Sequence, residues 1–89
     1  TKTYITAMRR LDITVKAHKQ IGRLGREDML AVYAAIETLA TWPDCRNVKA
    51  LKDRAGYRLR VGQFRVLFEV TVDSILVQEV RRRDERTYQ

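Results

Sequence analysis

The sequence predicts an α+β fold, in which an N-terminal strand and two helices pack on one face of an antiparallel sheet that ends in a three-strand meander. Two observations support this prediction. Apolar residues recur at helical spacing up to residue 42 and then alternate with polar residues from residue 57 onward. Short polar turns at 62–63 and 73–74 divide the second half into strands. The 89 residues are expected to form one small domain, 1–89, with a modest core.

A short strand is expected over residues 8–13, followed by a first helix over 15–24. Thr14 has a side chain suited to a helix N-cap, and Gly25 is a typical residue to end the helix. The apolar side of this helix is expected to consist of Val15, Ala17, Ile21 and Leu24.

The second helix is expected over residues 26–42. Its first turn carries Glu27 and Asp28, which the helix dipole favours at an N-terminus. Trp42 precedes the only proline and therefore leaves the helical region. The core-facing positions, at helical spacing, are Met29, Val32, Tyr33, Ile36, Leu39 and Ala40.

The meander is expected to comprise strands over 57–61, 64–72 and 75–82. Alternation in the middle strand places two sets of side chains on opposite faces. One face carries Phe64, Val66, Phe68, Val70 and Val72, and the other carries Arg65, Leu67, Glu69 and Thr71. The helices are expected to cover the first of these faces, because an amphipathic helix and a half-apolar sheet each need an apolar partner.

The charge of the chain indicates an anionic partner. Its net charge is +7, and residues 46–89 contribute +5 of this excess. Most of these cations are arginines, whose planar guanidinium matches phosphate better than an ammonium does. The partner is expected to be a nucleic acid or an acidic protein, although any single arginine is better explained by a solvated surface.

The composition argues against thiol or metal chemistry. Cys45 is the only cysteine, so it forms no internal disulfide, and we interpret it as a small buried or half-buried residue. His18 is the only histidine, so neither a thiol–histidine pair nor a zinc site is expected. We expect no cofactor, no metal and no membrane contact, and we expect a cytoplasmic location.

Arginines gather on the sheet face that the helices are expected to leave free. Arg58 and Arg60 alternate with apolar residues on the first meander strand, and Arg65 lies near Arg60 across the hairpin. Arg82 joins them if it follows the alternation of the third strand. Like charges opposed on a sheet destabilise it unless an anion binds between them, so this cluster predicts a phosphate site.

Such a cluster suits the cleavage of RNA, because RNA supplies its own nucleophile, the 2′-OH beside each phosphate. Arginines can align that oxygen and neutralise the charge of the transition state, but they stay protonated at neutral pH. Tyr88 is the candidate for proton transfer or for stacking on a base. Glu69 and Glu79 are alternative bases, which we interpret as salt-bridge partners of the arginines.

The segment "GYRLRVGQFRVLFEV" (56–70), a short hairpin, an arginine-rich strand end and a nearby tyrosine together resemble toxins of the RelE/ParE superfamily from bacterial type II toxin–antitoxin systems. The resemblance is good over 45–89 and general over 1–44. It implies the small RelE-like fold, entry into the ribosomal 30S A site, cleavage of mRNA there, and an antitoxin protein that wraps the toxin and blocks its site. It also implies an apolar antitoxin groove between the helices and the sheet edge, and contact with operator DNA only through the antitoxin complex.

By position, the resemblance assigns catalytic roles to five residues. Two family lysines match Arg58 and Arg60, a transition-state arginine matches Arg65, and an arginine six residues before the tyrosine matches Arg82, while the tyrosine matches Tyr88. Replacement of both lysines by arginine argues against a general-base role at those two positions and leaves charge stabilisation.

Other cations are expected to bind ribosomal RNA without specifying the reaction, or to form a solvated connector and rim. They are Lys49, Lys52, Arg54, Arg81, Arg83 and Arg86. Three other functions remain open at this point: a ParE-like inhibitor of DNA gyrase without nuclease activity, a non-enzymatic RNA-binding module, and a degenerate toxin kept as a co-repressor with its antitoxin.

Overall fold

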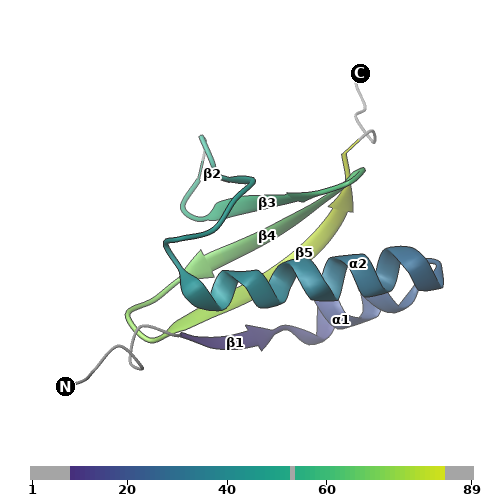
Figure 1. The fold of residues 1–89 in the computed structure, drawn as a ribbon, viewed down its shortest axis with the longest axis horizontal. Helices are drawn as coiled ribbons and strands as arrows, with labels where there is room; N and C mark the ends of the chain where they lie inside the picture. Colours follow the sequence, from purple (N-terminus) through teal and green to yellow (C-terminus); the bar gives the residue numbers. More distant parts are fainter. Residues whose placement is uncertain (1–8, 53, 84–89) are drawn as a thin grey trace.

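The structure, a computed structural model, describes residues 9–52 and 54–83. Two helices pack on a five-stranded sheet with strand order β1-β5-β4-β3-β2, which confirms the predicted α+β fold (Figure 1). The helices are α1 (Val15–Gly22) and α2 (Arg26–Glu37), and a 3-10 turn over Thr38–Thr41 follows α2. The strands are β1 (Arg10–Ile13), β2 (Val48–Ala50), β3 (Tyr57–Val61), β4 (Phe64–Val70) and β5 (Ser74–Arg82). None of the helices within these described ranges is long and apolar enough to cross a membrane.

The sheet differs from the prediction in two respects. β1 runs parallel to β5, from Arg10 opposite Ser74 to Ile13 opposite Val77, so the sheet is mixed. β2 adds an edge strand antiparallel to β3, within a segment that the sequence analysis treats as a connector. With only three residues, β2 is too short to show a strand period, and its place depends on pairing with β3.

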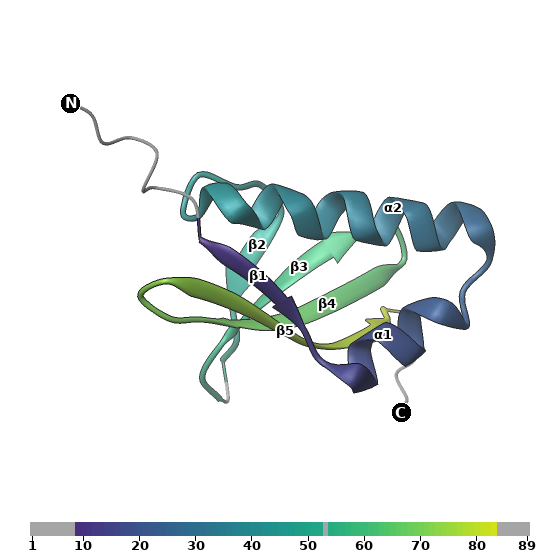
Figure 2. The ribbon, with the colours of Figure 1, turned by 90° about the horizontal axis from the view of Figure 1, so that it is seen from below.

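The two helices occupy different positions on the sheet. α2 runs across one face, whereas α1 lies beside the C-terminal half of β5 (Figure 2). Thr14 caps α1 as predicted, since its Oγ1 accepts a hydrogen bond of 3.1 Å from the amide of Ala17. α1 ends at Gly22, and Gly25 is the N-cap of α2 and not the end of α1. Val15 is 71% exposed, so its predicted place on the apolar side is wrong.

α2 ends five residues earlier than predicted. The hydroxyl of Thr38 donates to the carbonyl of Ala35 at 2.6 Å, and that of Thr41 donates to the carbonyl of Thr38 at 3.0 Å. Threonine hydroxyls compete for backbone groups in this way and tighten the last turn. Leu39 nevertheless stays fully buried, as predicted.

The helix-facing side of the sheet holds the core. Its fully buried side chains include Ile21 and Ile36 from the helices and Val66, Phe68, Ile75 and Val77 from the strands. The ring of Trp42 packs edge-on against Phe68 at 5.8 Å between centroids. This packing fixes which face of each strand points away from the helices.

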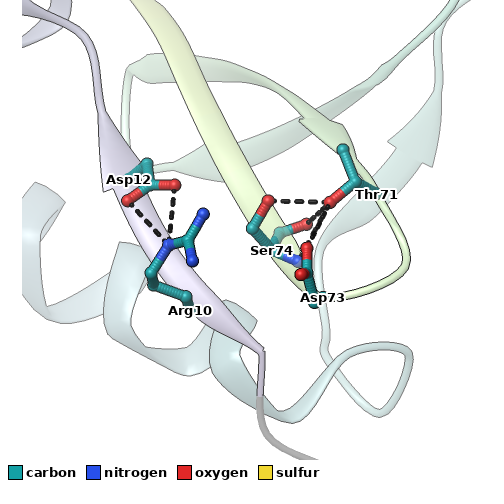
Figure 3. A network of polar contacts seen from close by, with 5 residues as sticks. All are labelled: Arg10, Asp12, Thr71, Asp73 and Ser74. Carbon is teal, nitrogen blue, oxygen red and sulfur yellow. Dashed lines mark hydrogen bonds and ion pairs between the residues drawn. The ribbon is translucent and has the colours of Figure 1, made fainter.

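The turn between β4 and β5 begins earlier than the sequence predicts. Oγ1 of Thr71 accepts from the amide of Ser74 at 3.0 Å and lies 2.7 Å from its hydroxyl oxygen (Figure 3). These bonds close the turn and end β4 at Val70, so Val72 is 89% exposed and not part of the predicted strand face. Nε of Arg9 donates to the carbonyl of Thr71 at 3.1 Å and ties the turn to the chain just before β1.

A β-bulge interrupts β5. Leu67 of β4 lies opposite Glu79, and the next residue, Phe68, lies opposite Val77. Gln78 is therefore the extra residue of the bulge. One extra residue inverts the alternation, so every side chain after it points to the opposite face from the one that the preceding residues predict.

Candidate nucleic-acid interface

Three arginines form a row across the sheet, on the face opposite to the core. Arg60 of β3 lies directly opposite Arg65 of β4, and Arg65 lies directly opposite Arg81 of β5. Directly opposed residues of neighbouring strands have their side chains on the same face. Arg58, two residues before Arg60, and Lys49, its partner on β2, extend this face toward the sheet edge. We call these five residues the basic face.

The β-bulge decides which arginine completes the row. Val80 lies opposite Val66 in the core, and Arg82 lies opposite Phe64 on the same side of the sheet. The guanidinium carbon of Arg82 is 5.3 Å from the centroid of the Phe64 ring. The prediction that Arg82 shares a face with Arg65 is therefore wrong, and Arg81, assigned to the rim by the sequence analysis, takes that position.

Arg65 lies at the centre of the basic charge. Burial lowers the pKa of its guanidinium below the usual value, and the charges of Arg58, Arg83, Arg60 and Arg81 lower the pKa further. Arginine remains protonated at neutral pH, so the like charges repel one another at a cost in free energy. Within 9–52 and 54–83, no ion pair involves Arg58, Arg60 or Arg65. A bound anion would relieve this repulsion.

Glu79 is the buried counter-charge of this region, with 9% of its surface exposed. One carboxylate oxygen lies 3.2 Å from Nζ of Lys16, and the other accepts from Nη2 of Arg81 at 3.0 Å. Burial raises the pKa of Glu79, but the hydrogen bonds and charges of Lys16 and Arg81 outweigh burial, so the pKa is lowered overall. The interpretation of Glu79 as a salt-bridge partner is confirmed. Among the described residues, Glu69 forms no ion pair, so within this part of the chain its interpretation as a salt-bridge partner is wrong.

Two pockets are each lined by more than one residue of the basic face. One, of about 250 Å³, lies at the β2–β3 edge and is lined by Lys49, Arg58 and Arg60 together with Asn47 and Val48. The other, of about 510 Å³, lies between α1 and the ends of β4 and β5, where Arg65 and Arg82 both line it. Arg65 and Arg82 thus share a pocket although they point to different faces of the sheet.

The contribution of α1 to the second pocket is absent from the sequence-based predictions. Lys16, Gln20 and Arg23 form its helical wall. Their spacing of four and three residues along one helix side is visible in the sequence. Which strand that side faces depends on the tertiary structure, so the pattern alone identifies no site.

The remaining predicted cations have different surroundings. Lys52 and Arg54 are exposed between β2 and β3 and line neither of these two pockets. Nη1 of Arg83 donates to the carbonyl of Gly62 at 2.9 Å, which ties the end of β5 to the β3–β4 turn. Arg86 and Tyr88, including the predicted catalytic role of the tyrosine, lie outside the described residues.

His18 and Cys45, for which no chemistry is predicted, have structural surroundings. Nδ1 of His18 is 2.9 Å from the hydroxyl of Tyr33, so it links α1 to α2 as a packing residue. Cys45 is partly buried against the core, and burial, followed by the charge of Asp44, raises the pKa of its thiol. No group of three potential metal ligands among His, Cys, Asp and Glu occurs in the part of the chain that the structure describes.

No family model matches the chain, and no curated protein is similar to it in sequence. Solved structures are similar in fold. The toxin–antitoxin complex RelBE2 of Mycobacterium tuberculosis aligns with a TM-score of 0.74 and 22% identity, over 85% of this chain and 99% of that one. The archaeal RelE–RelB complex of Pyrococcus horikoshii aligns with a TM-score of 0.76 and 21% identity, over 89% and 99%.

A chromosomal ParDE system of Pseudomonas aeruginosa is also similar, with a TM-score of 0.65 and 18% identity, over 85% of this chain and 97% of that one. The chain therefore has the fold of toxins from type II toxin–antitoxin systems. Within that class, its structural neighbours include RelE toxins as well as ParDE, as the sequence resemblance implies.

Proposed function

We propose that residues 1–89 form one toxin domain of a type II toxin–antitoxin pair, which cleaves mRNA in the ribosomal A site without a metal ion. The observation that carries this proposal is the row Arg60–Arg65–Arg81, which concentrates positive charge on an open sheet face. The fold supports the toxin assignment, and the row supports a phosphodiester as the group on which the protein acts.

The proposed reaction uses the nucleophile of the RNA itself. The 2′ oxygen forms a bond to the adjacent phosphorus, and the bond from phosphorus to the 5′ oxygen of the next nucleotide breaks. The products are a 2′,3′-cyclic phosphate and a 5′-hydroxyl end. One proton leaves the 2′-OH and one reaches the 5′ oxygen, so the overall charge is unchanged. The protein must hold the two oxygens in line and neutralise the charge that builds up on the phosphorane.

The arginines take the electrostatic part of this reaction. Arg65, at the centre of the row, is proposed to contact the non-bridging phosphate oxygens, with Arg60 and Arg81 on either side. Glu79 holds the guanidinium of Arg81 through the hydrogen bond to its Nη2. Donors that are fixed in place before the reaction stabilise the transition state without further reorganisation.

Proton transfer is assigned to the C-terminal tyrosine. Arginine does not release a proton at neutral pH, so Arg58 and Arg60 are proposed to bind RNA and not to act as bases. Tyr88 is proposed to transfer a proton or to stack on a base at the cleavage position. Arg82, which lies on the other side of the sheet, is proposed to bind RNA beside the reacting phosphate and not at it.

The proposed protein partner is an antitoxin. Two similar structures are toxin–antitoxin complexes, RelBE2 and RelE–RelB. An antitoxin that blocks this chain would have to cover the basic face, and an acidic segment would suit its charge. The ribosome as target places the protein in the cytoplasm in this proposal, and any contact with operator DNA would occur through the antitoxin complex.

Expression of the chain in growing bacteria tests the assignment. We expect pulse labelling of new protein to stop within minutes, while a DNA-damage reporter stays silent. Arg65→Ala should restore protein synthesis at an equal level of soluble toxin. Arrest of protein synthesis that is unaffected by Arg65→Ala would contradict the proposed site.

A ParE-like inhibitor of DNA gyrase is the second candidate. It is favoured by one observation: the described residues that line the two pockets include no histidine, and their one carboxylate, Glu79, is already paired with Lys16 and Arg81. An inhibitor that acts by binding needs no group for proton transfer. The same expression experiment separates the two, because a gyrase inhibitor would induce the DNA-damage reporter while protein synthesis continues.

A further inference from the structure

The pocket between α1 and the ends of β4 and β5 holds most of the excess charge of the protein. Its lining includes one carboxylate, Glu79, and six cations, a net charge of +5 compared with +7 for the whole chain. The cations are Lys16, Arg23, Arg65, Arg81, Arg82 and Arg83. A concave, strongly positive site of this kind attracts a polyanion and raises its local concentration.

Two side-chain contacts hold α1 in place against β5. β1 pairs with β5 only as far as Val77, so beyond it the edge of β5 that does not pair with β4 has no strand partner. Oε1 of Gln20 accepts a hydrogen bond of 2.7 Å from the amide of Val80, and the pair of Lys16 with Glu79 adds a second link. Arg23, one turn beyond Gln20, is therefore held beside the strand end.

The six cations of the pocket differ in their partners. Lys16 and Arg81 share the single carboxylate of Glu79. Arg65 and Arg83 form no ion pair with the described residues, and Nη1 of Arg83 donates to the carbonyl of Gly62. Arg23 and Arg82 form no ion pair with any of the described residues, and both are exposed. They share a pocket whose apolar lining includes Phe64, over which Arg82 is stacked. Two uncompensated guanidiniums beside an apolar surface repel each other, and a phosphate that both contact would add two attractive interactions that outweigh this repulsion.

We propose that this pocket is a subsite for one backbone phosphate of single-stranded RNA, next to the phosphate that the row Arg60–Arg65–Arg81 binds. Arg23 and Arg82 provide the contacts, and the place of the subsite beside a reacting phosphate rests on the proposed nuclease function. Arg65 and Arg81 belong to the row and also line the pocket, so the two phosphate positions are contiguous. The RNA strand thus runs from the sheet face, around the end of β5, to α1.

Salt-dependent binding of a short RNA tests the subsite. The probe is a fluorescent oligoribonucleotide with one 2′-deoxy nucleotide at the cleavage position, titrated at several KCl concentrations. The slope of log K against log salt is negative, and loss of one phosphate contact decreases its steepness by about 0.7 for a single strand. We expect the full decrease for the double variant, and a partial decrease for Arg23→Gln and for Arg82→Gln alone, because both side chains contact the same phosphate.

Arg26→Gln is the matched control. Arg26 is an exposed arginine at the start of α2, three residues from Arg23, and it is not part of the pocket lining. The substitution changes the charge by the same amount, so an unchanged slope in this variant shows that the decrease is local. Thermal unfolding of each variant verifies that the fold is intact.

Substitution in the RNA gives an independent measure. Uncharged methylphosphonates are placed at each position in turn beside the deoxy nucleotide. At one position we expect a loss of affinity in the wild type that is smaller in Arg23→Gln, as a double-mutant cycle requires for a direct contact. Equal losses in both proteins at every position, or an unchanged salt slope in Arg23→Gln, would overturn the subsite.

The outcomes separate the subsite from the nuclease function. If the wild type cleaves mRNA on ribosomes and the slopes of the two variants are unchanged, the subsite is rejected and the nuclease stands. If the wild type cleaves nothing and the slopes still decrease, the pocket binds RNA in a protein that is not a nuclease. If Arg23→Gln weakens binding of a polyglutamate peptide but not of RNA, the pocket serves an acidic protein and the subsite is rejected.

Discussion

Arg65 and Arg81 lie directly opposite each other on β4 and β5, on the sheet face that points away from the core. This relationship exists because Gln78 is an extra residue in β5, which inverts the alternation of the residues that follow it. Without the bulge, Val80 would lie opposite Arg65, Arg82 would share the face of Arg65 two residues further on, and Arg81, opposite Phe64, would point toward the core side.

The register predicts different kinetic effects for the two neighbouring arginines. Arg81→Ala is expected to lower the rate of single-turnover mRNA cleavage on programmed ribosomes by on the order of 100-fold, as for loss of one donor that stabilises a transition state. Arg82→Ala is expected to raise KM with a much smaller effect on kcat, since it removes a binding contact. A deep loss of kcat in Arg82→Ala, with near-normal kcat in Arg81→Ala, would contradict the assignment.

Glu79 is expected to link stability to acidic pH. Its pKa is lower in the folded chain than the usual 4.5, so its stabilisation is complete above about pH 4.5 and is lost as pH falls through the lower, folded-state pKa. Glu79→Gln should therefore reduce the free energy of unfolding by about 1–2 kcal/mol at pH 7, and the deficit should shrink at pH 3. Urea unfolding at both pH values measures this.

Glu69→Gln is the control for that experiment, because Glu69 forms no ion pair with the described residues. It should change the free energy of unfolding little at either pH. A deficit for Glu79→Gln that is equal at pH 7 and pH 3 would indicate lost packing and not lost charge.

Thr14 joins the start of α1 to the bulge. Its Oγ1 accepts from the amide of Ala17, and its hydroxyl donates to the carbonyl of Gln78 at 3.0 Å. Thr14→Ala should cost about 1–2 kcal/mol of stability. Thr14→Ser keeps the hydroxyl and should recover most of it in the same urea titration. Equal losses for both variants would show that the methyl group, and not the hydroxyl, matters.

Two glycines are expected to respond oppositely to alanine. Gly56 has a φ of +113°, and a Cβ there would lie 3.0 Å from the carbonyl oxygen of Phe68, so Gly56→Ala should lower Tm. Gly22 ends α1 with no atom near the position of a Cβ, so Gly22→Ala should stabilise by about 0.4–1 kcal/mol. Calorimetry of both variants measures the difference, and a rise in Tm for Gly56→Ala would contradict the account.

Sequence patterns predict much of this fold because they are local. The alternation of Tyr57, Leu59 and Val61 and the helical spacing of Val32 and Ile36 reflect burial, and the structure buries Leu59, Val32 and Ile36 as expected. β2 is missed because three residues carry no period, and its pairing with β3 is a tertiary interaction.

The candidate site is harder to predict, because one inserted residue in β5, Gln78, changes the face to which every later side chain of the strand points. The signal is present in β5: apolar residues are two apart at Ile75 and Val77, and three apart from Val77 to Val80. That change of spacing indicates a bulge and places Arg81, not Arg82, beside Arg65. The role of Arg23 depends on how α1 sits against β5, which no local pattern specifies.

A cleavage map on ribosomes tests the nuclease proposal most directly. Purified toxin is added to ribosomes stalled on a defined mRNA, and primer extension locates the new ends. The proposal predicts cuts confined to the A-site codon, with a 2′,3′-cyclic phosphate upstream, unchanged in Arg26→Gln and abolished in Arg65→Ala. The absence of A-site cuts with wild-type protein, or equal cutting by Arg65→Ala, would contradict it.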